Sequence, residues 1–175
     1  IKKGKISRKN ILQEYRNYVH SFVNKKYLQN LKIIIDAGNG MGGKIVPIIY
    51  NDLPFTIIKE CFEITGFFEK HDANPFIYRN TQDLRKNVIK KNADLGIAFD
   101  SDMDRVFFVD ENGRLVDSAA IASLIVKHFK KEIEKQGFLY SVTMSLALAE
   151  FAQENKIKAR RCPVGHAFIK KMLRD

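Results

Sequence analysis

The sequence predicts an α/β fold, a layered sheet of mainly parallel strands flanked by helices, with one complete domain and part of a second similar domain. Short apolar runs alternate along the chain with amphipathic segments of helical spacing, as in strand–helix–strand units. A second strand–helix series begins near Phe138. We therefore expect two domains, residues 1–116 and residues 117–175, and we expect the second to be truncated because it ends inside a helix.

The elements of the first domain follow from local patterns. Apolar residues at helical spacing predict a helix over 10–28, and an apolar run before a glycine-rich turn predicts a buried strand over 31–36. Thr81 is the expected N-cap of a later helix, and Asn112-Gly113 indicates a hairpin turn. The other expected elements are a helix over 41–50 that contains Pro47, a strand over 55–63, a loop over 66–78, a helix over 81–91, a strand over 93–99 and a hairpin of two strands over 105–116.

The second domain is expected to open with a long amphipathic helix. Its residues repeat apolar positions at helical spacing from Ser118 to Lys135. Shorter apolar and amphipathic segments then alternate. They predict a strand over 138–144, a helix over 146–155, a strand over 157–162 and the start of another helix over 167–173.

The composition is that of a soluble globular protein. Of the 175 residues, 45% are hydrophobic and 29% are charged, and no apolar run reaches the roughly 18 residues that a membrane span needs. The net charge is +10, but most lysines fall beside apolar positions of the predicted helices, so we expect solvated helix faces and neither a nucleic-acid nor a membrane partner. A basic nucleic-acid-binding domain, supported by charge alone, is the non-enzymatic alternative.

The two cysteines cannot form a disulfide framework, which favours a reduced, cytoplasmic location. We expect Cys61 to be a core thiol without a catalytic partner, and His20, His71 and His128 to be surface residues without partners. The first residue is not Met, so we expect the chain to begin inside a longer one.

Three aspartates carry the strongest chemical signal. Asp100, Asp102 and Asp104 alternate directly after the apolar run 93–99, and ligands gather at the carboxyl ends of strands in open α/β sheets. Three carboxylates so close together repel one another unless a cation lies between them, and oxygen ligands favour Mg²⁺. Arg105 follows at once and can hold a phosphate bidentately. The segment therefore predicts a metal site suited to phosphoryl transfer.

Three other interpretations compete for this segment. A solvated acidic turn explains a single Asp better than three in alternation. An EF-hand is excluded, because its sixth position requires Gly and Arg105 stands there, although Glu111 falls at the twelfth position. A haloacid-dehalogenase-type phosphatase also places Asp-x-Asp after an apolar strand. That resemblance would make Asp100 the nucleophile and Asp102 the acid/base, and it remains the alternative.

Residues 93–106 resemble the second-domain signature of the α-D-phosphohexomutases, the phosphomannomutase/phosphoglucomutase family. That family has a strand, then Asp-Gly-Asp-x-Asp-Arg, then a hairpin. Residues 34–43 resemble the strand and glycine-rich turn that open the same domain, and residues 163–170 resemble the Gly-His segment of the third domain. Together with the stretch around Asn74-Pro75, the resemblance covers most of residues 10–175.

The resemblance implies an enzyme that interconverts hexose 1-phosphate and hexose 6-phosphate, of mannose or glucose, through a phosphoserine and a bisphosphate intermediate. Mg²⁺ would be held by Asp100, Asp102 and Asp104. Arg105 would contact phosphate or the hexose phosphate substrate. Gly165 and His166 would bind substrate, and His166 would have a catalytic role in proton transfer.

The chain departs from the family pattern in two respects. This chain has no phosphoserine motif, so the missing domains 1 and 4 would be its partners and the fragment alone would be inactive. Ser101 replaces the usual Gly, which would strain the loop if that position needs a positive φ.

The glycine-rich turn and His166 can each be interpreted in a second way. The glycine-rich turn 38–43 could cradle a phosphate but lacks the Lys-Ser/Thr ending of a P-loop, so we favour a structural turn. Without the resemblance, a capping or exposed side chain would explain His166 equally well.

Overall fold

The structure is a computed structural model that describes residues 4–174 and divides into two compact units, 1–115 and 116–175. The first unit is built on a four-stranded sheet with the strand order β2-β1-β3-β4. β1 pairs in parallel with β2 on one side and with β3 on the other, and β4 is antiparallel to β3. The mainly parallel α/β fold is thereby confirmed. The strands are β1 (Leu31–Asp36), β2 (Phe55–Glu60), β3 (Leu95–Phe99) and β4 (Val106–Val109).

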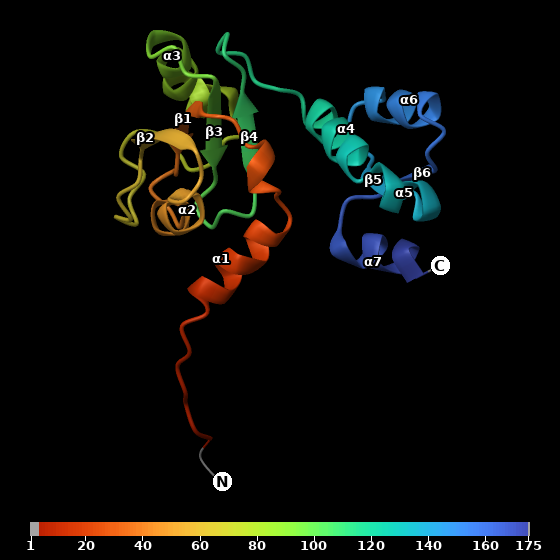
Figure 1. Ribbon diagram of the computed structural model, residues 1–175, viewed down its shortest axis with the longest axis horizontal. Coiled ribbons are helices and arrows are strands. Elements are labelled where there is room, and N and C mark those ends of the chain that lie inside the picture. Colours follow the sequence, from red (N-terminus) through yellow and green to blue (C-terminus); the bar gives the residue numbers. More distant parts are fainter. Residues whose placement is uncertain (1–3, 175) are drawn as a thin grey trace. The chain divides into compact units, whose positions relative to one another are not determined.

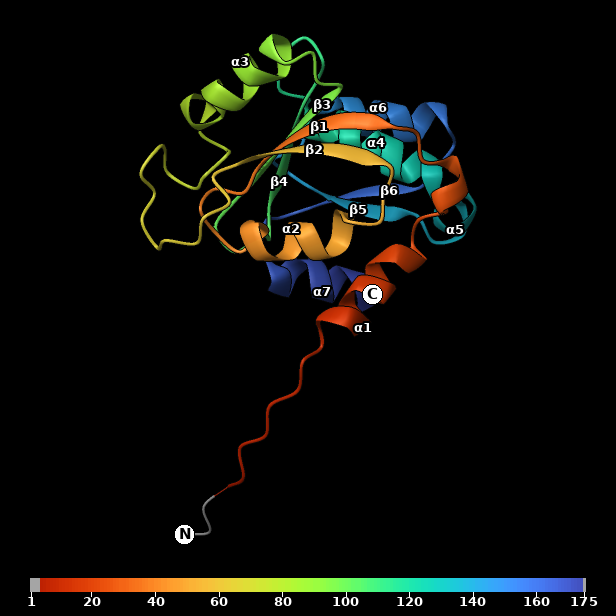
Figure 2. The same cartoon turned by 60° about the vertical axis from the view of Figure 1, so that its left-hand side comes forward.

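Helices cover both faces of this sheet (Figures 1 and 2), α2 (Gly42–Tyr50) on one side and α3 (Gln82–Lys90) on the other. Successive side chains of β1 point to opposite faces, because a strand has a two-residue period. Ile34 packs with Leu84 of α3, whereas Ile33 and Ile35 pack with Val46 of α2. Burial on both faces explains why β1 is an unbroken apolar run rather than an alternating one.

The N-terminal helix is shorter than its apolar pattern predicts. α1 (Leu12–Ser21) contacts α2, and a separate 3₁₀ turn, η1 (Lys25–Tyr27), follows it. The side chain of Asn24 accepts a hydrogen bond from the backbone N–H of Lys26, 3.1 Å away. The predicted helix over 10–28 is therefore wrong in its second half, because this Asn begins a new turn instead of continuing the helix.

The predicted hairpin over 105–116 has only one strand. Beyond β4 the chain returns to it at a single bridge between Val109 and Leu115. The Asp110 carboxylate accepts hydrogen bonds from the backbone N–H groups of Asn112 (3.0 Å) and Arg114 (2.7 Å). These bonds stabilise a tight turn around Gly113, whose φ is +72°. The backbone N–H groups of Asn112 and Arg114 therefore bind the Asp110 carboxylate and do not pair with a second strand.

The start of α3 also differs from the prediction. A 3₁₀ turn, η2 (Tyr78–Thr81), leads into it. Thr81 holds the N-cap position, but its hydroxyl donates to the Tyr78 carbonyl oxygen at 3.0 Å and makes no capping bond. The predicted capping role of Thr81 is therefore wrong.

The second unit contains a parallel pair of strands, β5 (Phe138–Ser141) and β6 (Ala159–Cys162). The predicted helix over 118–135 is broken at Phe129, which leaves helical angles (φ −95°, ψ 26°) as its ring packs edge-on against His128 at 4.8 Å. The Asp117 carboxylate caps the first piece by accepting from the N–H of Ala119 at 2.7 Å. The helices are α4 (Ser118–His128), α5 (Lys130–Gln136), α6 (Ala147–Glu154) and α7 (His166–Arg174).

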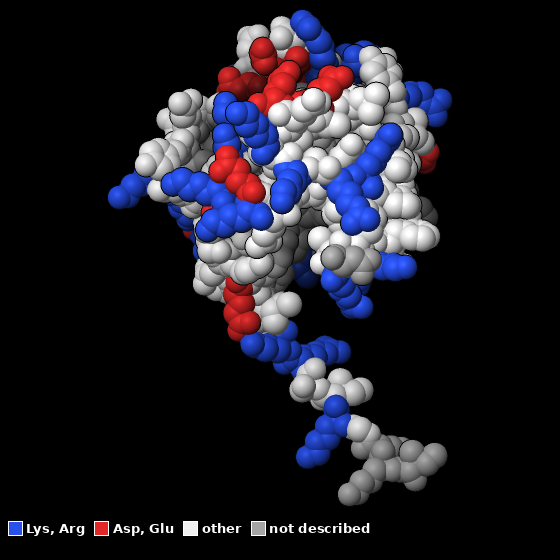
Figure 3. All heavy atoms as spheres, turned by 90° about the vertical axis from the view of Figure 1, so that its right-hand side faces the viewer, with Lys and Arg blue, Asp and Glu red and all other residues white. Residues whose placement is uncertain are grey.

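Within residues 4–174, none of the helices is both long enough and apolar enough to cross a membrane. The excess positive charge is spread out on the face that Figure 3 shows, where lysine and arginine side chains lie in separate groups with acidic side chains among them. This distribution accords with solvated helix faces, and the absence of a nucleic-acid partner stays a prediction.

Candidate metal centre

The three predicted aspartates converge at the carboxyl end of β3. Asp100 directly follows the last residue of the strand and is fully buried, whereas Asp102 and Asp104 are exposed. One carboxylate oxygen from each lies within 4.8 Å of the other two. The loop therefore presents a compact set of oxygen ligands at one edge of an open α/β sheet, where ligands bind in folds of this kind.

The loop turns sharply between its first and second exposed aspartates. The N–H of Met103 donates to the carbonyl oxygen of Asp100 at 3.2 Å, and Met103 has a φ of +69°. Ser101 has no such backbone angle. The strain expected at Ser101 therefore does not arise, because the left-handed position of this turn falls two residues later.

Arg105 binds the buried carboxylate of Asp100 twice. Its backbone N–H donates to Oδ1 at 3.0 Å and its side-chain Nε–H donates to Oδ2 at 2.5 Å. Burial raises the pKa of the Asp100 carboxyl, but the backbone and side-chain hydrogen bonds from Arg105 outweigh burial, so this pKa lies below its ordinary value. Asp100 is therefore held ionised, and its charge is balanced by a guanidinium group that is half exposed.

The exposed Asp104 is compensated less fully, although Nε of Arg105 lies 3.4 Å from its Oδ1. A hydrogen bond with Asp100, and then the negative charge of Asp102, raise the pKa of Asp104 above its ordinary value. Crowded carboxylates of this kind favour a cation among them, and a donor set made only of oxygen suits Mg²⁺. The residues therefore fit the ion. Arg105 contacts Asp100 where the ion would bind, and its side chain is 52% exposed, so it has room to move aside.

The glycine-rich turn before α2 packs directly on this loop. The N–H of Met41 donates to the carbonyl oxygen of Ser101 at 2.8 Å. A Cβ placed on Gly40 would lie only 2.1 Å from the same oxygen. Gly40 is thus required for a close approach between two backbone segments, which supports the interpretation of this turn as structural.

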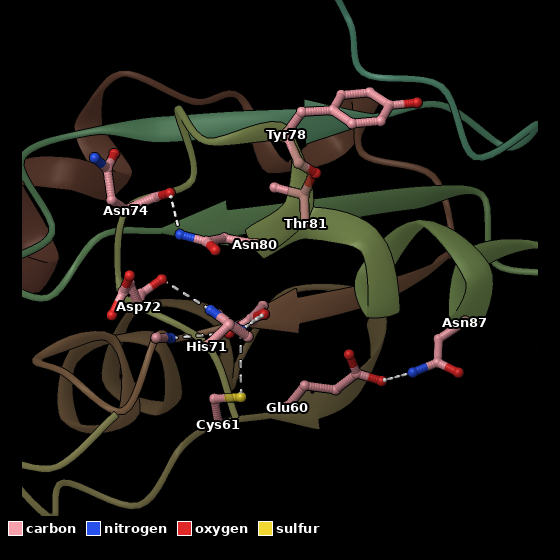
Figure 4. A network of polar contacts seen from close by, with 11 residues as sticks. Glu60, Cys61, His71, Asp72, Asn74, Tyr78, Asn80, Thr81 and Asn87 are labelled. Atoms are coloured by element: carbon pink, nitrogen blue, oxygen red, sulfur yellow. Dashed lines mark hydrogen bonds and ion pairs between the residues drawn. The ribbon is translucent and has the colours of Figure 1, made fainter. Parts of the chain in front are cut away.

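Sequence reasoning missed a support for Arg105. Its terminal nitrogen donates to the side-chain oxygen of Asn74 at 3.3 Å. The buried amide of Asn80 in turn donates to the carbonyl oxygen of Asn74 at 3.0 Å, a bond drawn in Figure 4. The only signal in the sequence is Asn74-Pro75, which marks a turn. Its approach to Arg105, 31 residues away, depends on how the loop folds back over the sheet.

The other predicted site residues lie in the second unit. His166 is the first residue of α7 and is exposed, and the preceding Gly165 has a φ of +128°, which favours glycine. The carbonyl oxygen of Gly165 accepts the N–H of Ile169 at 3.1 Å and so begins the helix. The catalytic and substrate-binding roles of Gly165 and His166 stay predictions.

A second polar cluster contradicts the expectations for the histidines and Cys61. His71 Nε2 lies 2.8 Å from Oδ2 of Asp36 and 3.8 Å from Sγ of Cys61 (Figure 4). The hydrogen bond to Asp36, followed by that to Cys61, raises the pKa of His71 to about 11. Cys61 is only half buried and has a polar partner, so it is not a core thiol. His20 is also partnered, since its Nε2 lies 2.6 Å from the carbonyl oxygen of Ile49.

An α/β/α domain with an acidic loop at the carboxyl end of a central strand defines a protein of the open-sheet class with a ligand site at that edge. Family comparison assigns the chain more narrowly. Residues 13–113 match the family model "Phosphoglucomutase/phosphomannomutase, alpha/beta/alpha domain II", and residues 117–175 match domain III of the same family. The chain therefore belongs to the phosphoglucomutase/phosphomannomutase family.

Individual relatives agree with this assignment. The chain is 31% identical to a phosphomannomutase of Escherichia coli, over 99% of this chain and 39% of that protein. It is 29% identical to a phosphoglucosamine mutase of Caldicellulosiruptor bescii, over 97% of this chain and 38% of that protein. It thus spans less than two fifths of the length of these curated relatives.

Solved structures share the fold. A phosphoglucomutase/phosphomannomutase family protein from Burkholderia thailandensis superposes with a TM-score of 0.84 at 24% identity, over 94% of this chain and 36% of that one. The parafusin phosphoglucomutase from Paramecium, in its open form, gives a TM-score of 0.67 at 19% identity, over 87% of this chain and 29% of that one. These matches do not support the alternative phosphatase.

Proposed function

We propose that this chain supplies the two middle domains of an enzyme that interconverts hexose 1-phosphate and hexose 6-phosphate, and that its aspartate loop holds Mg²⁺. The observation that carries the proposal is the convergence of Asp100, Asp102 and Asp104 within 4.8 Å at the end of β3. The names of the relatives, phosphomannomutase and phosphoglucosamine mutase, support a phosphorylated hexose as the substrate class. The phosphoserine and the remaining phosphate contacts would come from the missing domains 1 and 4.

The residues of the loop divide the work between them. Bound Mg²⁺ would neutralise charge on the phosphoryl group, which is most of what catalysis requires in phosphoryl transfer. Asp100 anchors the loop and orients Arg105, whose guanidinium is half exposed and also bonded by Asn74. A guanidinium placed beside the acidic loop binds phosphate oxygens bidentately. His166 moves a proton at the reacting hydroxyl, and Gly165 gives the backbone room to approach the sugar.

Calorimetric titration of the chain with Mg²⁺ or Mn²⁺ tests the metal loop. The variant Asp102→Asn/Asp104→Asn removes two exposed ligands and leaves the Asp100–Arg105 pair intact. Its matched control, Glu150→Gln/Glu154→Gln, removes two exposed acidic charges from α6 in the second unit. We expect binding in the wild type and in the control, and none in the aspartate variant. Equal binding in all three proteins would refute the aspartate loop as the metal site.

The activity is tested in the full-length parent protein. We expect the parent to convert mannose 1-phosphate or glucose 1-phosphate to the 6-phosphate, and the Asp102→Asn/Asp104→Asn parent to lose this conversion. The 175-residue chain alone should be inactive, because it has no phosphoryl donor. Conversion by the isolated chain would contradict the proposed division of labour among the domains.

A further inference from the structure

Asp36, Cys61 and His71 come from three different segments and meet at one point. Asp36 is the last residue of β1, Cys61 follows the last residue of the neighbouring parallel strand β2, and His71 lies in the loop between β2 and η2. Their potential ligand atoms, a carboxylate oxygen, a sulfur and a ring nitrogen, lie within 4.8 Å of one another. Figure 4 shows the His71 ring directed toward Cys61, with Asp72 on its other side.

The two nitrogens of His71 have different partners, and this fixes the tautomer. Nδ1 lies 2.9 Å from the carbonyl oxygen of Asp72, which can only accept a hydrogen bond, so Nδ1 carries a proton. In the neutral ring Nε2 is then an unprotonated acceptor. Nε2 nevertheless faces the Asp36 carboxylate at 2.8 Å, and that carboxylate is also only an acceptor when ionised. Something positive must therefore lie between the two atoms, either a proton or a metal ion.

The same nitrogen also faces the sulfur of Cys61, at 3.8 Å. This excludes a catalytic triad, in which the thiol and the carboxylate bind opposite nitrogens of the ring. The arrangement suits a metal ion instead, because one nitrogen, one carboxylate oxygen and one sulfur lie within 4.8 Å of one another. Tetrahedral zinc bonded at its usual lengths would set the nitrogen about 3.3 Å from the oxygen and about 3.6 Å from the sulfur. The observed nitrogen–oxygen separation of 2.8 Å is about 0.5 Å shorter and the nitrogen–sulfur separation of 3.8 Å is about 0.2 Å longer, so a small widening of the His71–Asp36 contact would admit the ion.

The groups behind the ligands hold them in place. The hydrogen bond from Nδ1 of His71 to a backbone carbonyl oxygen is the usual outer contact of a zinc-bound histidine. The other oxygen of Asp36 accepts the N–H of Gly38 at 2.9 Å, and the carbonyl oxygen of Cys61 accepts the N–H of Asn39 at 2.7 Å. All three ligands therefore approach the centre from fixed directions.

There is also room for a fourth ligand. A pocket of about 220 Å³ is lined by the three residues together with the acidic Glu60 and Asp83, the basic Lys70 and Lys86, and Asn87. The carboxylate of Glu60 is already bonded by the amide of Asn87 at 2.8 Å, so a water molecule is the expected fourth ligand.

We propose that Asp36, Cys61 and His71 form a binding site for Zn²⁺, separate from the aspartate loop. One sulfur and one nitrogen among three ligands suit a borderline-soft ion such as Zn²⁺, whereas the oxygen-only aspartate loop suits Mg²⁺. The glycine-rich turn links the two sites, since the N–H of Asn39 bonds to Cys61 and the N–H of Met41 bonds to Ser101. Zinc therefore fastens the turn on which the aspartate loop rests.

Titration with Co²⁺, which replaces zinc and reports a sulfur ligand by a thiolate-to-metal absorption band in the near ultraviolet, tests this proposal. In the reduced 175-residue chain we expect the band to saturate at one Co²⁺ per chain and to disappear on addition of Zn²⁺. Cys61→Ser should abolish the band, and Cys162→Ser, which alters the other cysteine, should keep it. The Asp102→Asn/Asp104→Asn variant should also keep it, so the outcome does not depend on the Mg²⁺ loop.

A second variant and a second measurement cover the case in which Cys61→Ser does not fold. His71→Gln should weaken Co²⁺ binding by at least about 100-fold, as expected for a residue in direct contact with the metal. Zn²⁺ should also slow alkylation of Cys61 in the wild type, as followed by mass spectrometry of the labelled peptide. Absence of the band in the wild type, or a band that survives Cys61→Ser, overturns the proposal. Unchanged alkylation of Cys61 with Zn²⁺ does the same.

Discussion

Gly40→Ala tests whether the glycine-rich turn supports the aspartate loop by close packing. The added Cβ would lie 2.1 Å from the carbonyl oxygen of Ser101, so the two segments must separate by about 0.9 Å to reach even a tight contact of 3.0 Å. Gly40 does not have a positive φ, so its backbone angles tolerate alanine and the effect is steric. Overpacking costs about 1–3 kcal/mol, and the lower entropy of the unfolded alanine chain offsets about 0.4–1 kcal/mol of it. We expect a net loss on the order of 1–2 kcal/mol.

Urea unfolding measures this loss as a lower midpoint with an unchanged slope. Gly4→Ala is the matched control, because a Cβ there has no atom within 4 Å, and we expect it to leave the midpoint unchanged. Because the turn also bonds to Ser101 through Met41, the Gly40→Ala variant should bind Mg²⁺ about 10-fold or more weakly in the calorimetric titration. A Gly40→Ala protein as stable as the wild type, with the same affinity for Mg²⁺, would refute the packing argument.

Three further predictions concern stability. The pKa of His71 is raised to about 11, so the His71–Asp36 pair stabilises the fold fully below a pH of about 6.5 and loses its effect as the pH rises toward 11. With EDTA present, the difference in urea midpoint between the wild type and His71→Gln should therefore shrink from about pH 6 to about pH 10. A difference that stays constant over this range would contradict the prediction. Leu84→Ala leaves a cavity under α3 and should lower the free energy of unfolding by about 2–5 kcal/mol in urea unfolding. A loss below about 1 kcal/mol would contradict this prediction. Asp117→Ala removes the cap of α4 and should lower the free energy of unfolding by about 0.5–2 kcal/mol in urea unfolding. Asp117→Asn keeps a capping oxygen and should recover most of this stability in the same assay.

The location of both candidate sites follows from the sheet. β1, β2 and β3 are parallel neighbours, so Asp36, Cys61 and Asp100 all emerge at the same edge. The cluster of Asp36, Cys61 and His71 lies at the ends of β1 and β2, and the aspartate loop lies at the end of β3. The turn after β1 contacts both, which gives a physical path by which occupancy of one site affects the backbone of the other.

The predicted elements agree with the structure best where the pattern is dense and local. The strand over 31–36 and the helix over 41–50 appear nearly as expected, because each is an uninterrupted apolar or amphipathic run. Two of the errors fall where a polar side chain redirects the backbone. Asn24 ends the helical pattern with a new turn, and Asp110 draws two backbone N–H groups into a tight turn in place of a second strand.

The sequence by itself predicted the aspartate loop as a candidate metal site, because its three carboxylates lie within five residues and directly follow a strand. It also determined the alternation of strands and helices that places this loop at a sheet edge. Only the tertiary structure revealed the cluster of Asp36, Cys61 and His71. His71 lies 10 residues from Cys61 and 35 residues from Asp36 along the chain. Their meeting depends on which strands become neighbours and on how the loop between β2 and η2 folds back over the strand ends, and both are set by packing between distant segments rather than by any local pattern.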